Sequence, residues 1–229
     1  MCYYEFKTHT LFNRLYIMIK ALILDLDNTI YPVASIGNEM FEPLFNLLDK
    51  HKRAIGEDKL PEIKQLIMKK AWQKVAEQYE FSTELKEAGT ELLRNTTFTH
   101  KMQTFADYEH VKPLPHDKYL VTMGFTKLQH SKVKMLGLEN DFIGILINDP
   151  DLTTDTKREV FEEILLNNSY KTNEVLVIGD DPDSEIKAAQ AIGIITVLYD
   201  RNNDFPDAQV NHRIKSFEEL IHVIDQYNN

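Results

Sequence analysis

The sequence predicts an α/β fold, in which helices cover both faces of a doubly wound parallel sheet and a small all-helical domain is inserted into it. Two observations favour this class. Short apolar runs alternate with helical patterns through most of the chain, which is typical of a parallel sheet built from strand–helix units. Helical patterns alone occupy the interval between the first two runs, at 35–106. The 229 residues suffice for one or two compact domains.

The first predicted strand indicates where the core domain begins. Ala21–Leu24 is a short apolar run that ends in acids, as expected of a strand buried on both faces. The core should begin near Met18, so we expect a core domain at 18–34 and 107–229. Residues 1–17 show no clear period and are expected to form an N-terminal extension. The hypotheses for this extension are that it is disordered or that it is foreign to the native product.

The later strands and helices follow in alternation. The remaining predicted strands are short and bordered by polar residues or glycine, and they lie at 119–121, 143–147, 174–178 and 194–198. The helices between them begin at capping residues or end at glycine, and they are expected at 126–136, 156–166 and 184–192, with a last helix at 216–227.

The insertion after the first strand is predicted to be helical throughout. Met40, Leu44, Leu47 and Leu48 fall on one stripe of a helix, and similar stripes follow them. No strand pattern interrupts these stripes, and a segment of this length is more than a loop. We therefore expect a helical cap domain at 35–106.

Composition and charge restrict the partners. The chain has 26 Lys and Arg against 36 Asp and Glu, a net charge of −10. This charge argues against a nucleic-acid polymer as partner, because proteins bind phosphate backbones through clustered Lys and Arg side chains. The longest apolar stretch, Leu15–Leu26, contains Lys20 and Asp25 and is too short to cross a membrane. The single Cys2 excludes a disulfide-rich secreted scaffold. A cytoplasmic protein that acts on a small molecule fits these observations, and the oligomeric state stays open.

The first string that indicates chemistry follows the first strand and reads Asp25-Leu26-Asp27-Asn28-Thr29. Side chains alternate along an extended segment, so Asp25 and Asp27 should point the same way. Two carboxylates in one small space repel each other unless a cation lies between them or one keeps a proton, and an active site can use either outcome. The alternative is an acidic turn capped by Asn28 and Thr29.

A second acidic string follows the fourth predicted strand and opens a helix. Asp180 and, after it, Asp181 are candidate ligands for Mg²⁺, because this ion prefers oxygen ligands and these acids leave a strand end. Asp183 or Ser184 is expected to cap the helix. Glu185, in the first turn, is expected to complement the helix dipole.

Lysine and threonine add a candidate anion site. Lys157 lies in the first turn of a helix, where a cation opposes the helix dipole, and a bound phosphoryl group would compensate it. The alternative is an exposed lysine paired with Asp155 or Glu159. Thr122 ends the second strand, and its hydroxyl together with the backbone amide of Met123 could hold phosphate oxygens.

These features follow one order along the chain: acid pair, hydroxyl, lysine, acid pair. Each lies at the carboxyl end of a strand or the amino end of a helix, and those ends meet on one rim of a parallel sheet. In this order the sequence resembles the haloacid dehalogenase superfamily of hydrolases over about 18–199. The insertion resembles the C1-type helical cap of that family. The sequence of residues 25–32 is similar to the corresponding motif of its pyrimidine 5′-nucleotidase-like branch.

The resemblance implies a Rossmann-like core and specific catalytic roles. Asp25 would be the nucleophile, and Asp27 would be the general acid and base. The phosphoryl group would be bound by Thr122, Met123 and Lys157.

The resemblance also implies a magnesium cofactor. Mg²⁺ would be held by the carboxylate of Asp25, the backbone carbonyl of Asp27 and the carboxylate of Asp180. Asp181 and Glu185 would lie behind these ligands.

The predicted function is therefore a Mg²⁺-dependent phosphatase of small phosphorylated metabolites that acts through an aspartyl phosphate, with nucleoside 5′-monophosphates as one substrate class. A dehalogenase needs no acid for a halide leaving group, so Asp27 favours phosphate esters. Two alternatives stay open: a phosphoaccepting receiver domain of a signalling protein, and an inactive relative that only binds phosphate. A stable aspartyl phosphate would indicate the receiver, and the absence of phosphate release would indicate the binding protein.

Overall fold

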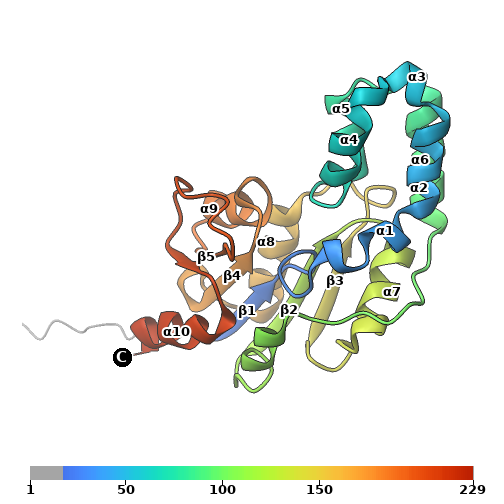
Figure 1. The fold of residues 1–229 in the computed structure, drawn as a ribbon. Helices are drawn as coiled ribbons and strands as arrows, with labels where there is room; N and C mark the ends of the chain where they lie inside the picture. Colours follow the sequence, from blue (N-terminus) through green and yellow to red (C-terminus); the bar gives the residue numbers. More distant parts are fainter. Residues whose placement is uncertain (1–17, 229) are drawn as a thin grey trace, which may run out of the picture.

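The computed structural model describes residues 18–228 as a six-stranded parallel sheet with helices on both faces and a helical arm at one end (Figure 1). The strand order is β3-β2-β1-β4-β5-β6, and every neighbouring pair is parallel. The strands are β1 (Ala21–Leu24), β2 (Asp117–Met123), β3 (Gly144–Asn148), β4 (Val175–Gly179), β5 (Ile195–Tyr199) and β6 (His212–Ile214). The predicted α/β class is confirmed, and the hypotheses for 1–17 concern residues outside the described range.

Alternation along β1 supplies both faces of the core. Ala21 and Ile23 pack in one buried cluster, and Leu22 and Leu24 pack in the other. The face of Ala21 is covered by α8 (Lys157–Asn168) and α9 (Lys187–Ala191), and the opposite face is covered by α7 (Thr126–Leu136) and α10 (Leu220–Asn228). The sheet therefore has no open face, which explains the uninterrupted apolar runs of its strands.

The predicted helices of the core are found with one correction. α7 has the predicted bounds and ends at Gly137, which adopts the left-handed conformation (φ 69°) that favours glycine. The helix expected at 184–192 instead begins with a single π turn, η5 (Pro182–Ile186). The residue that caps this turn is Asp181, whose side chain accepts a hydrogen bond from the Asp183 amide at 2.8 Å. The prediction that Asp183 or Ser184 is the cap is therefore wrong.

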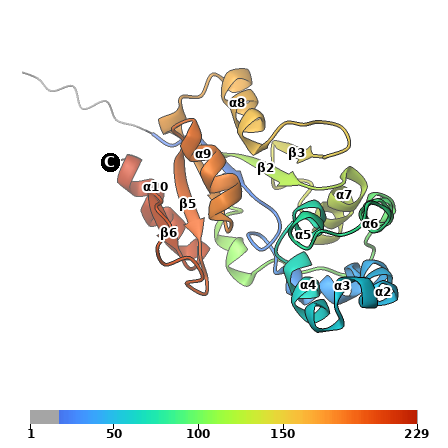
Figure 2. The same cartoon turned by 90° about the horizontal axis from the view of Figure 1, so that it is seen from above.

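The segment between β1 and β2 forms the predicted helical cap. Its helices are α1 (Gly37–Met40), α2 (Glu42–Lys50), α3 (Lys52–Ile55), α4 (Leu60–Ile67), α5 (Trp72–Gln78) and α6 (Thr83–Asn95). Short 3-10 turns complete the chain: η1 (Val33–Ser35), η2 (Glu57–Lys59), η3 (Ala106–His110), η4 (Thr172–Glu174) and η6 (Phe217–Glu219). Figure 2 shows the cap helices gathered at the side of the molecule remote from α10. Among the helices of residues 18–228, none combines the length and the apolar character that crossing a bilayer requires.

The cap is packed onto the core rather than tethered to it. One buried cluster contains Leu24 and Leu26 of the core together with Leu44 and Ile63 of the cap. Because apolar packing is continuous between the two parts, burial does not mark a sharp boundary. The bounds 18–34 with 107–229 and 35–106 stay predictions.

Candidate active site

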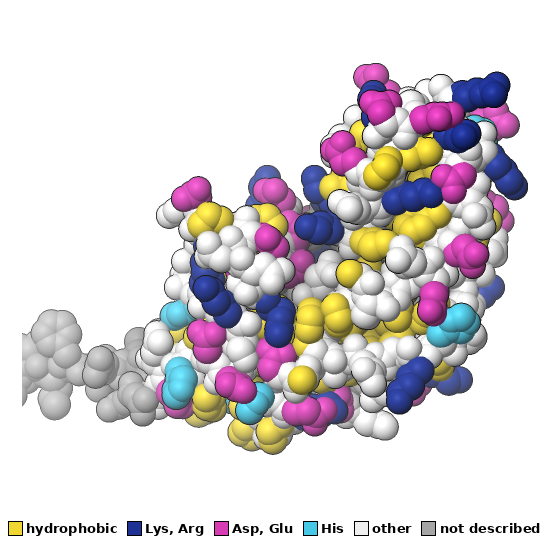
Figure 3. Space-filling model, in the orientation of Figure 1, with side chains coloured by type: hydrophobic (Ala, Val, Ile, Leu, Met, Phe, Trp, Pro, Cys, Tyr) yellow, Lys and Arg dark blue, Asp and Glu magenta, His cyan; other side chains and the backbone are white. Residues whose placement is uncertain are grey.

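A cleft of about 330 Å³ lies between the cap and the sheet, and the residues that follow β1, β2 and β4 form its floor. Open α/β sheets bind ligands at the carboxyl ends of their strands, at the point where the order of the strands reverses from one half of the sheet to the other. The lining includes every predicted site residue: Asp25, Asp27, Thr122, Met123, Lys157, Asp180, Asp181 and Glu185. Figure 3 shows Lys or Arg side chains beside acidic side chains in the hollow between the two parts.

Three carboxylates and one lysine, here called the acid cluster, converge in this cleft. Asp25 follows β1, Asp180 follows β4 and Glu185 lies in η5, and one oxygen of each lies within 4.8 Å of the others. Lys157 Nζ is 2.5 Å from Asp25 Oδ1 and 2.8 Å from Glu185 Oε2. Three carboxylates and one ammonium carry a formal charge of −2. A divalent cation would balance this charge.

The electrostatics of the acid cluster favour added positive charge. Burial raises the pKa of Asp25 to about 7, although the charge of Lys157 opposes this shift. Burial, together with the negative charges of Glu185 and Asp25, also raises the pKa of Asp180 well above its usual range. Burial alone would lower the pKa of Lys157, but its carboxylate neighbours raise it, so this lysine stays charged. A cation bound here would stabilise the ionised forms of both aspartates.

Glu185 is more deeply involved than predicted. Its side chain is only 2% exposed and fills space that Gly179 leaves open, since a Cβ atom at 179 would lie 2.1 Å from Glu185 Oε1. The same oxygen accepts a hydrogen bond from the Asp181 amide at 2.8 Å. Glu185 was expected to complement the helix dipole and, from the resemblance, to lie behind the metal ligands; neither expectation included its buried ion pair with Lys157.

Lys157 is not the exposed residue of the alternative interpretation. It is 5% exposed, and its ion pairs reach Asp25 and Glu185. Glu159 is one of the two acids that the alternative interpretation pairs with Lys157. It instead accepts a hydrogen bond from the Thr156 amide at 2.7 Å and completes a capping box at the start of α8. The pairing of Lys157 with Asp155 or Glu159 is therefore wrong.

Asp27 is held by a second group of residues, here called the Asp27 cluster. Lys132 Nζ lies 2.8 and 3.0 Å from the two carboxylate oxygens, Gln129 Nε2 lies 3.1 Å from Oδ2, and the Tyr31 hydroxyl donates to Oδ1. Burial would raise the pKa of Asp27, but Lys132 and the hydrogen bonds from Tyr31 and Gln129 lower it overall. Asp25 and Asp27 thus have separate protein partners: Lys157 contacts Asp25, and Lys132 contacts Asp27.

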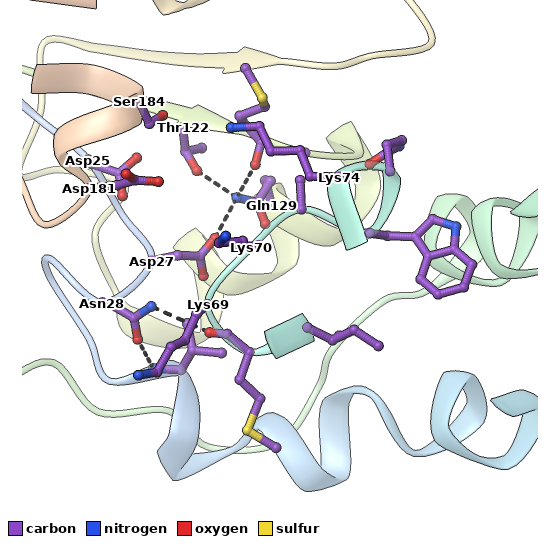
Figure 4. A pocket seen from close by; sticks show the side chains of 18 of the residues that line it. Asp25, Asp27, Asn28, Lys69, Lys70, Lys74, Thr122, Gln129, Asp181 and Ser184 are labelled. Atoms are coloured by element: carbon purple, nitrogen blue, oxygen red, sulfur yellow. Dashed lines mark hydrogen bonds between the residues drawn. The ribbon is translucent and has the colours of Figure 1, made fainter. Parts of the chain in front are cut away.

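Three members of the Asp27 cluster were not predicted from the sequence: Tyr31, Gln129 and Lys132. Gln129 Nε2 also lies 2.6 Å from Thr122 Oγ1, so it links Thr122 to Asp27 (Figure 4). Gln129 and Lys132 are three residues apart in α7, which places them on one face, and they are 2% and 4% exposed. The spacing of three residues could have indicated that Gln129 and Lys132 act together. The sequence does not show, however, which face of the helix is buried.

The parallel sheet, the helical cap and the acid-lined cleft define a capped α/β fold with a candidate active site. The model of the haloacid dehalogenase-like hydrolases matches residues 22–199, so the chain belongs to this family. Curated proteins gave no match. The resemblance found in the motifs is thereby confirmed at the level of the superfamily.

Solved structures share the fold at low sequence identity. A HAD phosphatase from Thermococcus onnurineus is 19% identical with a TM-score of 0.61, covering 90% of this chain and 98% of its own. A 2-haloacid dehalogenase from Pseudomonas syringae is 20% identical with a TM-score of 0.60, covering 92% and 100%. The Bacillus subtilis HAD-hydrolase YfnB, solved bound to magnesium, is 18% identical with a TM-score of 0.60, covering 91% and 99%. At these identities the similarity establishes the fold alone.

Proposed function

We propose that this chain is a Mg²⁺-dependent phosphatase that hydrolyses phosphate monoesters of small metabolites. One observation carries the proposal: a buried acid cluster with a formal charge of −2 lies in the same cleft as a separately held second aspartate, Asp27. The family and the magnesium-bound state of YfnB support it. Asp27 favours a phosphatase over a dehalogenase, because a halide leaving group needs no proton donor.

The donor set fits Mg²⁺, which prefers oxygen ligands. The proposed ligands are the carboxylates of Asp25 and Asp180 and the backbone carbonyl of Asp27. When bound, the ion would neutralise charge on the phosphoryl group and its attacking carboxylate. Glu185 would act through Lys157, and Asp181 would hold the η5 turn by capping it.

The first chemical step would transfer the phosphoryl group to the protein. The Asp25 carboxylate would attack phosphorus, forming an oxygen–phosphorus bond while the bond to the ester oxygen breaks. Lys157, the hydroxyl of Thr122 and the amide of Met123 would bind the phosphoryl oxygens. Asp27 would give its proton to the leaving oxygen.

The second step would release phosphate. Asp27, now ionised, would take a proton from a water molecule that attacks the aspartyl phosphate, and Asp25 would be restored as a carboxylate. The pairing of Asp27 with Lys132 suits this step, because the pair holds Asp27 as an anion. The first step instead requires Asp27 to take up a proton against Lys132. Esters with acidic leaving groups should therefore react faster than alkyl esters.

Nucleoside 5′-monophosphates are one substrate class within this proposal. They are included because residues 25–32 are similar to the pyrimidine 5′-nucleotidase-like branch of the family. Sugar phosphates and phosphorylated acids are the other classes to compare.

A phosphate-release assay on the full chain tests the proposal. Nucleoside monophosphates, sugar phosphates and phosphorylated acids are supplied with Mg²⁺, and each is repeated in EDTA. We expect release from at least one class, loss of release in EDTA, and recovery on adding Mg²⁺. A stable aspartyl phosphate without turnover would favour the receiver alternative, no release from any ester would favour an inactive binding protein, and full activity in EDTA would exclude the metal site.

A further inference from the structure

We infer that Lys69 and Lys70, in the cap turn between α4 and α5, bind a second anionic group of the substrate. The substrate would then be a phosphate ester whose leaving group carries a carboxylate or a second phosphate. This inference rests on the proposed function, since that function places the phosphoryl end at the acid cluster.

The cap turn is tied to the loop that follows β1. Asn28 Nδ2 donates a hydrogen bond to the carbonyl of Met68 at 3.4 Å, and Asn28 Oδ1 accepts one from the Val33 amide at 3.2 Å (Figure 4). Asn28 itself has a positive φ of 58°, a conformation that asparagine tolerates better than most residues. Lys69 and Lys70 therefore follow directly after a point that is bonded to the segment carrying Asp25 and Asp27.

Trp72 anchors the other side of the turn. Its side chain is 3% exposed, and its indole N–H donates to the carbonyl of Lys86 at 3.2 Å. A Cβ atom at Gly89 would lie 2.2 Å from the Trp72 ring, so α6 approaches the indole as closely as a glycine allows. With both ends anchored, residues 69–71 are held at the cleft by packing rather than left to move as a free loop.

The two lysines bring positive charge into the cleft without a protein partner. Both are exposed and line the cleft, and among residues 18–228 none of the ion pairs within 4.0 Å includes either of them. Of the other cap lysines, Lys64 pairs with Asp49 at 2.8 Å and Lys74 interacts electrostatically with Asp181 across the cleft, whereas Lys59 forms none of these ion pairs in the described part of the chain but lies outside the cleft. An anion from outside the protein is the partner that this arrangement lacks.

The dipole of α4 gives a simpler reason for two lysines at its end, since cations stabilise a helix C-terminus. That reason accounts for charge at these positions, but it would hold equally well if the side chains faced bulk solvent. It does not account for a turn that is bonded to Asn28 and faces the carboxylates of Asp25, Asp27 and Asp181 (Figure 4).

The cleft sets the shape of the ligand. The acid cluster and the cap turn both line the cleft, and apolar side chains such as Phe41, Ile67 and Leu128 line it as well. A small molecule with an anion at each end matches this distribution. A nucleobase carries no negative charge at neutral pH, so it would offer neither lysine an anionic group of the ligand.

Two phosphonates that cannot be hydrolysed test the inference by calorimetry, with and without Mg²⁺. They are 3-phosphonopropionate, which carries a distal carboxylate, and propylphosphonate, which lacks it. We expect the full chain to bind 3-phosphonopropionate about fivefold to tenfold more tightly, the gain that two partly exposed ion pairs typically give. Propane-1,3-diphosphonate distinguishes a second phosphate from a carboxylate as the preferred group. Equal affinities for all three ligands would overturn the inference.

Variants assign the preference to the cap turn. In the double variant Lys69→Gln and Lys70→Gln, the ratio of affinities should fall to about 1. In Lys59→Gln, a change at an exposed cap lysine outside the cleft, the ratio should stay as in the original chain. A ratio that persists in the double variant would show that other groups recognise the anion.

Binding and turnover separate this inference from the proposed function. A preference for the doubly anionic ligand without hydrolysis of any ester would support the anion site and refute the phosphatase. Hydrolysis of esters with an affinity ratio of 1 would support the phosphatase and refute the anion site.

Discussion

The acid cluster and the Asp27 cluster lie on opposite sides of the same short loop, yet their charges differ. On the side of β4, three carboxylates share one lysine, and the group has a formal charge of −2 when all three are ionised. On the side of α7, Lys132 alone faces Asp27, and two further side chains donate hydrogen bonds to the same carboxylate. The first group is short of positive charge, and the second is balanced.

The difference teaches that neighbouring residues can have opposite chemical environments when their partners come from distant elements. Burial acts on both aspartates in the same direction, but only Asp27 has donors enough to outweigh it. In the proposed reaction, Asp25 would bind the cation and attack phosphorus, and Asp27 would exchange a proton. Four changes test this contrast.

Replacing Asp25 by Asn should have the largest effect. The amide cannot act as the nucleophile, so phosphate release should fall by about 10⁴-fold or more. Steady-state assays with Mg²⁺ measure this, and circular dichroism checks that the fold is kept. Asp58→Asn, at an exposed cap position, serves as the matched control and should change little. Unchanged turnover in the Asp25 variant would refute the role of this residue.

Replacing Asp27 by Asn should have a smaller effect, a loss of about 10²-fold, because positioned acid–base groups contribute this much. The loss should be greater for an alkyl phosphate than for an aryl phosphate, since the alkyl leaving group depends more on a proton donor. Rates for a matched alkyl and aryl pair provide the measurement. Equal losses on both esters would argue against a proton-transfer role.

Replacing Lys132 by Met should slow turnover by about tenfold and lower the free energy of unfolding by about 1–2 kcal/mol, because it leaves the partly buried Asp27 without its counter-charge. A double-mutant cycle with Asp27→Asn measures the coupling between the two residues. Lys134→Met, an exposed change on the same helix, is the control. A coupling energy near zero would mean that the ion pair is incidental.

The affinity for Mg²⁺ should depend on pH, with the smallest of the four effects. Burial raises the pKa of metal-free Asp25 to about 7, so a falling pH protonates this ligand and weakens binding, whereas a rising pH ionises it and strengthens binding. Calorimetry at pH 6, 7 and 8 should show a several-fold tightening, with most of the change below about pH 7. In Asp25→Asn the part of this dependence that comes from Asp25 should disappear, and only the part that comes from Asp180 should stay. A flat profile in the original chain would contradict the assigned environment.

Local signals explain what could be predicted from the sequence. α7 was predicted to the residue because its end depends on Gly137, a neighbour in the chain. The site residues were expected together because parallel strands bring their carboxyl ends to one rim, and all of them line one cleft. By contrast, β6 contains only three residues, and it is a strand because β5 is available to pair with it.

Distant contacts and competing neighbours explain what could not be predicted. Lys132 lies 105 residues from Asp27 in the chain, so no local pattern connects them. The cap of η5 was misassigned because Asp181, Asp183 and Ser184 are all competent capping residues, and backbone geometry decides among them. The depth of Glu185 was missed because an acid in a first helical turn is usually exposed, and only the space beside Gly179 makes burial feasible.

That space has an evolutionary consequence. Positions 179 and 185 compete for one volume. The end of the Glu185 side chain occupies the space that a Cβ atom at position 179 would need. In descendants of this chain, a side chain at 179 would force the Glu185 side chain out of its present position and so away from Lys157. The two residues should therefore be inherited as a unit, and a change at one should be followed by a shorter partner at the other.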